Sequence, residues 1–224
     1  MSASTTTIAT RQPLAASTTD AYGREFWEHL WRTAGLQSVG CFVGAYFVYG
    51  YQPEVAAIFA GMAILNLMWF AAAIRTTLID AGQDGWGAGA TASSAALGAF
   101  LLLLVAGQTA LTHSIAGLGN QTLTSALNDV VWAGVVMTSF PRAMLIMAGT
   151  FGLWRGGLIS NAQFAAGVAA VVLVLAGGST WVSDGFWAPS GAYSRFISPA
   201  IAFVWIAAVS RVLLNRAPVS RAGW

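Results

Sequence analysis

Apolar residues in this chain form six long blocks separated by short polar stretches. Blocks such as "LGAFLLLLVAG" and "AAGVAAVVLVLAGG" do not alternate apolar and polar residues, as the strands of a membrane barrel would. Within a bilayer only a helix satisfies all the backbone groups of such a block internally. The pattern therefore predicts an all-α integral membrane bundle of six transmembrane helices. The expected spans, with boundaries uncertain by a few residues, are 36–51, 55–74, 90–111, 130–154, 163–182 and 196–214.

The polar and amphipathic stretches outside these blocks divide the rest of the chain. Residues 1–21 are rich in Ser, Thr and Ala without an apolar run, which predicts a disordered N-terminal tail. In 22–35 the apolar side chains recur every fourth residue opposite arginines, which predicts an amphipathic segment at the membrane interface or in the first turns of the first span. Residues 36–214 would then form the transmembrane domain, and 215–224 a cytoplasmic C-terminal tail.

Composition agrees with this class and excludes several functions. Hydrophobic residues make up 57% of the 224 residues and charged residues 8%, whereas soluble domains are about 25% charged. The sequence contains no lysine, so it can form neither a lysine Schiff base nor a phosphate-binding P-loop. Cys41 is the single cysteine, which excludes an intrachain disulfide and a cysteine-based metal site.

The arginines predict the orientation. With six spans, eight of the ten arginines fall in segments on one side of the membrane, and the loops on the opposite side contribute only Arg195. Because positively charged segments remain in the cytoplasm, we expect both termini to be cytoplasmic. These eight arginines are Arg11, Arg24, Arg32, Arg75, Arg155, Arg211, Arg216 and Arg221.

Polar residues inside the expected spans are the first candidates for function. Asn66 lies in the middle of the second span, and Arg142 follows Pro141 in the fourth. Thirteen residues separate Arg142 from Arg155, which places Arg142 roughly 20 Å from the cytoplasmic boundary, in the outer half of the membrane. Pro141 should kink this span. Arg142 would either extend to the outer headgroups, bind the kinked backbone and Asn66, or form an anion or polar-substrate site facing an outer cavity.

A second group of candidates lies near the outer face. The segment "SDGFWAPSGAYSRF" contains Asp184, Trp187, Tyr193 and Arg195, and it predicts either an aromatic belt at the interface or a functional loop. His113 and Asp129 belong to the same side. His29 and His113, the only histidines, are expected on opposite sides of the membrane, so they cannot share a metal or a haem. We therefore expect no metal, no cofactor and no catalytic set.

Small residues predict close packing of helices. Gly40 and Gly44 form a G-x-x-x-G pattern in the first span, which allows helix backbones to approach. The pattern does not distinguish packing within the chain from contact with a protein partner or a second copy. The lipid bilayer is the partner that the composition predicts, and no nucleic-acid partner is expected.

Several longer segments resemble a group of uncharacterised bacterial membrane proteins with multiple spans. The segments are "LNLMWFAAAIRTTLIDAGQDGWGAGATASSAALG", "LTSALNDVVWAGVV", "MLIMAGTFGLWRGGLIS" and "SDGFWAPSGAYSRFISP". The resemblance covers the second to sixth spans and implies a location in the bacterial plasma membrane. It implies no activity, because the group has none assigned.

Three functions remain compatible with the sequence. The first is a non-enzymatic bundle that binds a lipid or hydrophobic ligand or serves as a partner subunit. The second is a transporter or channel component that moves a small solute past Arg142 and Asn66, which a cavity reaching both residues would favour. The third is an intramembrane enzyme, which would require His113, Asp129 and Asp184 to lie together.

Overall fold

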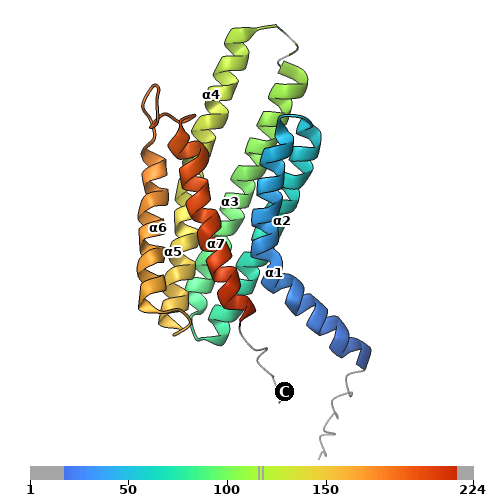
Figure 1. Cartoon of the computed structure of the whole chain (residues 1–224), viewed down its shortest axis with the longest axis vertical. Helices are drawn as coiled ribbons and strands as arrows, with labels where there is room; N and C mark the ends of the chain where they lie inside the picture. The colour runs from blue at the N-terminus through green and yellow to red at the C-terminus, as the bar shows by residue number, and fades with distance from the viewer. Residues whose placement is uncertain (1–17, 116, 118, 216–224) are drawn as a thin grey trace, which may run out of the picture.

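The computed structural model describes residues 18–115, 117 and 119–215. This part of the chain is all-α (Figure 1). Its main helices are α1 (Thr18–Tyr49), α2 (Pro53–Asp80), α3 (Asp84–Ala110), α4 (Gln121–Met137), α5 (Ser139–Arg155), α6 (Asn161–Ala176) and α7 (Ser198–Leu214). Short helical turns extend three of them: η1 (Leu111–Ile115) after α3, η3 (Gly177–Ser179) after α6, and η4 (Tyr193–Ile197) before α7.

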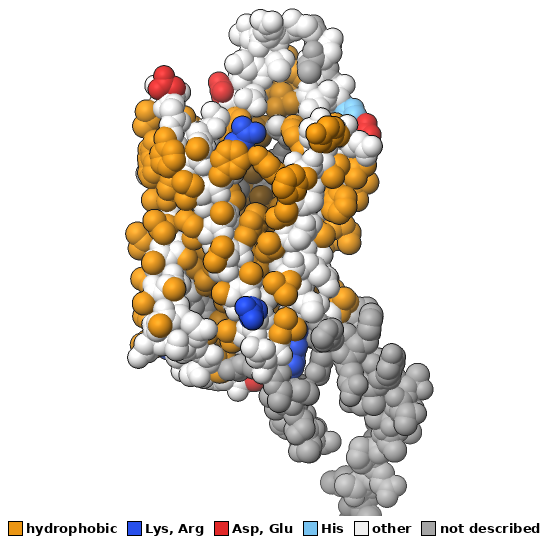
Figure 2. All heavy atoms as spheres, in the orientation of Figure 1, with side chains coloured by type: hydrophobic (Ala, Val, Ile, Leu, Met, Phe, Trp, Pro, Cys, Tyr) orange, Lys and Arg blue, Asp and Glu red, His pale blue; other side chains and the backbone are white. Residues whose placement is uncertain are grey.

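Five helices are long and apolar enough to cross a membrane. They are Pro53–Asp80, Asp84–His113, Gln121–Arg155, Asn161–Ser179 and Tyr193–Leu214. In the view of Figure 2, apolar side chains cover the middle of the molecule, and most of the charged side chains visible there lie toward its two ends. By helix length and hydropathy the chain is a multi-span helical membrane protein. The expected first span, 36–51, corresponds to the second half of α1, which is not among these five helices.

Six helices form a closed ring. Each packs against the next in the order α1, α2, α3, α5, α6, α7, and α7 returns to α1. Of these six contacts, the one between α6 and α7 is the least extensive. In Figure 1 the N-terminal part of α1 leaves the bundle at the same end as the C-terminus of α7. Each helix of the ring therefore presents one side to the centre of the bundle and another to its surroundings.

The core of the ring is apolar and closely packed. Phe70, Ile74 and Leu78 of α2 are fully buried, and the ring of Phe70 meets that of Trp205 on α7 edge to face, with 6.1 Å between ring centroids. A β-carbon on Gly149 of α5 would lie 2.7 Å from the Trp205 ring, closer than packed atoms approach. The backbone of α5 therefore approaches α7 closely because position 149 carries no side chain.

The helix ends differ in places from those expected. Residues 18–21, expected in the tail, begin α1, and 22–35 continue the same helix into the bundle. The segment 112–128, expected to be a loop, is mostly helical, since η1 continues α3 and α4 begins at Gln121. The side chain of Asn120 accepts a hydrogen bond from the Leu123 amide and so caps α4. Asparagine is a favoured residue at the start of a helix, so a polar segment can still begin one. The tails predicted at 1–17 and 216–224 lie outside the described residues.

The fourth expected span contains the predicted irregularity. It is divided at Thr138, three residues before Pro141, into α4 and α5. Pro141 has no amide hydrogen to donate to the Met137 carbonyl. At the same break the Thr138 hydroxyl donates to the Val135 carbonyl, at 2.6 Å. The break lies directly beside Arg142, so it determines where that side chain points.

Candidate functional site

Arg142 lies in the first turn of α5 and its side chain is directed into the bundle. Its Nη1 donates a hydrogen bond to the Ser198 hydroxyl at the start of α7, at 3.3 Å. Its Nη2 donates to the Thr138 hydroxyl at the helix break. In the structure the guanidinium is bound by hydroxyls of the protein itself, and its reach to the headgroups stays a prediction. The break at Thr138 supplies one hydroxyl partner, and the neighbouring α7 supplies the other.

A cavity of about 180 Å³ lies beside this guanidinium. The walls come from α1, α2, α3, α5 and α7, with Val135 from the end of α4. Thr138 and Arg142 provide the polar side chains of the wall. The other residues that line the cavity are mainly leucines, isoleucines and aromatic residues. The cavity therefore combines one cation with an apolar enclosure at the centre of the ring.

Asn66, the other intramembrane candidate, belongs to a different environment. Its side-chain amide donates to the Met62 carbonyl of its own helix, at 3.0 Å. It does not line the cavity beside Arg142. The hydrogen bonds of Arg142 therefore go to Thr138 and Ser198, and that of Asn66 goes to its own helix.

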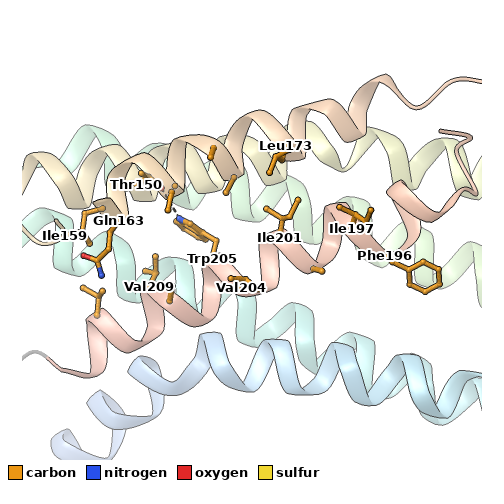
Figure 3. Close-up of a pocket in the computed structure, with 17 residues that line it drawn as sticks. Thr150, Ile159, Gln163, Leu173, Phe196, Ile197, Ile201, Val204, Trp205 and Val209 are labelled. Carbon is orange, nitrogen blue, oxygen red and sulfur yellow. Dashed lines mark hydrogen bonds between the residues drawn. The ribbon is translucent and has the colours of Figure 1, made fainter. Parts of the chain in front are cut away.

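A larger apolar groove runs between α6 and α7 (Figure 3). It has a volume of about 710 Å³, and its lining residues extend along η4 and α7 from Phe196 to Val212, which corresponds to roughly 24 Å of helix. On α6 the groove is lined mainly by small side chains, namely Ala166, Gly167, Ala169 and Ala170. These small residues leave the space open.

Polar groups are confined to two places in this groove. On its floor the Trp205 indole donates to the Thr150 hydroxyl of α5, at 2.9 Å (Figure 3). At its end near Ile159, the Gln163 side chain accepts a hydrogen bond from the Ser160 amide, at 2.9 Å, within the cap of α6. The Trp205 and Thr150 groups satisfy each other, so the groove offers a largely apolar surface.

Sequence reasoning did not identify this groove. Its signal was present as the small residues of "NAQFAAGVAA" at the start of α6. Small residues predict that something approaches a helix closely, but not whether it is another helix of the chain or an apolar ligand. The answer depends on how α6 lies against α7.

The segment between α6 and α7 brings together two of its four candidates. Trp187 and Tyr193 pack ring against ring, with 4.4 Å between their centroids. The Tyr193 hydroxyl donates to the Leu173 carbonyl of α6, at 2.7 Å, and its side chain is 6% exposed. The Trp187 indole donates to the Ser179 carbonyl, at 3.2 Å. These contacts close the end of α6 against the start of α7, which is a structural role.

The two charged candidates of this segment lie apart from that closure. Asp184 is exposed in the loop. Arg195 is exposed on η4, where its guanidinium lies 5.2 Å from the centre of the Phe196 ring and 6.0 Å from that of Trp132. Neither charge enters the cavity beside Arg142 or lines the groove.

The remaining candidates do not form a catalytic group. His113 lies 3.4 Å from a carboxylate oxygen of Glu54 at the start of α2, a partner that the sequence did not indicate. Asp129 is exposed on α4. Among the residues with described placement, no three His, Cys, Asp or Glu side chains lie together as metal ligands. The juxtaposition of His113, Asp129 and Asp184 that an intramembrane enzyme would require is not among the observed contacts.

The glycines proposed for helix packing differ from each other. A β-carbon on Gly44 would lie 3.4 Å from the Phe59 ring of α2, whereas one on Gly40 would meet open space. Gly44 therefore packs within the chain. Contact with a partner through Gly40 stays a prediction.

Comparison with known proteins gives no identification. The chain matches no family model, no curated protein and no solved structure. The functional conclusion consequently depends on the groove and the cavity themselves.

Proposed function

We propose that this protein is a non-enzymatic, lipid-binding membrane bundle that holds an acyl chain in the groove between α6 and α7. The observation that supports this proposal most directly is the groove itself, with its volume of about 710 Å³ and its almost entirely apolar lining. An apolar surface inside a bilayer contacts lipid chains wherever no protein covers it.

The position of the groove favours a lipid chain. Its lining on η4 and α7 extends over roughly 24 Å, most of a hydrocarbon core about 30 Å thick. Of the five candidate spans, α6 is the least buried within the molecule. An acyl chain lying between α6 and α7 would fill the space that their limited packing leaves open.

We further propose that the protein lies in the plasma membrane of a bacterium with both termini in the cytoplasm. The distribution of arginines supports this orientation, and the resemblance to uncharacterised bacterial membrane proteins supports the location. In this orientation α1 supplies a sixth span, shielded by α2 and α7, against which it packs.

Filling the groove tests the lipid proposal. Ala170 lines the groove, whereas Val172 on the same helix is 61% exposed and does not line it. Ala170→Trp and Val172→Trp therefore add the same side chain to α6, inside and outside the groove. Native mass spectrometry of the protein with palmitoyl-oleoyl phosphatidylglycerol counts the lipids that remain bound.

We expect Ala170→Trp to retain one lipid fewer than the original protein, and Val172→Trp to retain the same number. Equal retention by both variants would contradict the proposal. A dimer that Ala170→Trp dissociates would contradict it as well, because the groove would then hold a helix of a partner subunit.

A further inference from the structure

We propose that the cavity beside Arg142 is a binding site for a small carboxylate anion with a short apolar chain. This site lies at the centre of the ring and is separate from the lipid groove, although Trp205 borders both. The inference therefore goes beyond the proposed lipid function and does not depend on it.

The first reason is an uncompensated charge. The hydrogen bonds of the Arg142 side chain go to two neutral hydroxyls, those of Thr138 and Ser198, and no carboxylate of the described residues pairs with it. A guanidinium keeps its charge in a protein, and a charge in apolar surroundings is costly unless it is paired. An anion entering the cavity would provide the missing countercharge.

The second reason is the set of donors that remain. A guanidinium has five N–H groups in a planar fork that matches a carboxylate, and the two hydroxyls accept only two of them. The Thr138 hydroxyl donates to the Val135 carbonyl, whereas the Ser198 hydroxyl has no such acceptor in the described part of the chain. Arg142 lines the cavity and can offer its remaining N–H groups to the two oxygens of a carboxylate. Ser198 is not part of the cavity wall, and its hydroxyl holds the guanidinium in position.

The third reason is the size and character of the rest of the cavity. Its volume of about 180 Å³ corresponds to roughly six water molecules in the liquid, too small for a whole lipid. Beyond the guanidinium it is walled by apolar side chains such as Leu97, Leu145 and Phe203. A short alkyl chain suits these walls, whereas an inorganic anion would leave them without a partner.

The shape of the molecular surface is compatible with entry of an anion into the cavity from one side of the bundle. The molecular face in Figure 2 is hollowed beside the part of α7 near its N-terminal end. At that end of α7, Ser198 accepts a hydrogen bond from Arg142. The next residue, Pro199, forms part of the cavity wall.

Calorimetric titration of the full-length protein in lipid nanodiscs with butanoate tests the site. We expect butanoate to bind and butanamide, which has the same shape without the charge, to bind at least about tenfold more weakly. Arg142→Gln should weaken butanoate binding at least about tenfold. The matched control is Arg195→Gln, which removes an exposed arginine outside the cavity and should leave binding unchanged.

Several results would overturn the proposal. They are the absence of butanoate binding, equal binding of butanamide, competition by chloride at the concentration of butanoate, or equal loss in Arg142→Gln and Arg195→Gln. If Arg142→Gln does not fold, Ser198→Ala keeps the charge and should still weaken butanoate binding severalfold; unchanged binding would count against the site. Ala170→Trp, which fills the lipid groove, should keep its butanoate affinity. The lipid count and the butanoate affinity therefore test the two proposals independently.

Discussion

Arg142 shows how far a single residue can be interpreted from sequence. Arg142 and Arg155 lie on one continuous helix, α5, as the spacing argument required, while the depth of Arg142 in the membrane stays a prediction. The proline predicted the irregularity beside it. The direction of the side chain was not predictable, because its partner Ser198 is 56 residues away in sequence and is brought to it only by the packing of α7. Local sequence determines where the charge lies, but tertiary structure determines what it contacts.

Replacing Arg142 by a neutral side chain of similar length should stabilise the empty protein. In Arg142→Met the buried charge is removed and the side chain can pack against the leucines of the cavity. A charge in apolar surroundings without a countercharge is costly, so its removal should lower the free energy of the folded state. We therefore expect a higher midpoint of thermal unfolding in detergent, measured by the intrinsic fluorescence of the tryptophans.

The control for this change is Arg195→Met, on the exposed surface of η4. It should alter the free energy of unfolding by less than about 0.5 kcal/mol, as surface substitutions usually do. A clear loss of stability in Arg142→Met would show that the arginine holds α5 to α7 through Thr138 and Ser198, and that its charge is not a cost to the fold.

At the scale of elements, the existence of the helices was predictable and their ends were less so. The apolar blocks correspond to α2, α3, α4 with α5, α6 and α7. The extension of α3 by η1 and the start of α4 at Gln121 differ from the prediction, because the polar residues there favour a loop. Outside the hydrocarbon core a helix can continue through polar residues, and a capping side chain such as Asn120 determines where it begins.

The packing of α6 depends on one small residue. A β-carbon added to Gly167 would overlap the Thr150 side chain of α5, and this threonine is already held by the Trp205 indole. Gly167→Ala should therefore destabilise the protein by about 1–3 kcal/mol. Its unfolding midpoint in detergent should fall below that of the original protein.

Gly40→Ala is the matched control, because a β-carbon at Gly40 in α1 meets no atom within 4 Å. It should leave stability unchanged or raise it slightly, since alanine favours a helix over glycine. If both substitutions had the same effect, α6 would not pack on α5 as closely as the structure shows.

At the scale of the whole molecule, the sequence predicted the class of the protein and offered a cavity at Arg142 as one alternative, but it did not predict the groove between α6 and α7. Composition and block length were sufficient for a multi-span helical bundle. The groove between α6 and α7 and the cavity at Arg142 arise from contacts between helices distant in sequence, and many of their lining residues are ordinary leucines and alanines. Such residues carry no signal of a site until the helices are placed around them.

The central claim is that α6 and α7 cross the membrane with their groove facing lipid, and cysteine accessibility tests it most directly. In a Cys41→Ala background, single cysteines at Asp184, Ala162 and Val204 sample the outer loop, the start of α6 and the middle of α7. All three positions are exposed in the molecule itself, and Val204 is 70% exposed. The protein chain itself therefore does not protect Val204, and we expect the surrounding bilayer to do so.

The reagent is a membrane-impermeant maleimide applied to intact cells and then to permeabilised cells. The account predicts that the cysteine at 184 reacts in intact cells, the cysteine at 162 only after permeabilisation, and the cysteine at 204 in neither. Reaction at 204 with the membrane still present would contradict the lipid-facing groove, and reaction of 162 from outside with 184 protected would reverse the orientation.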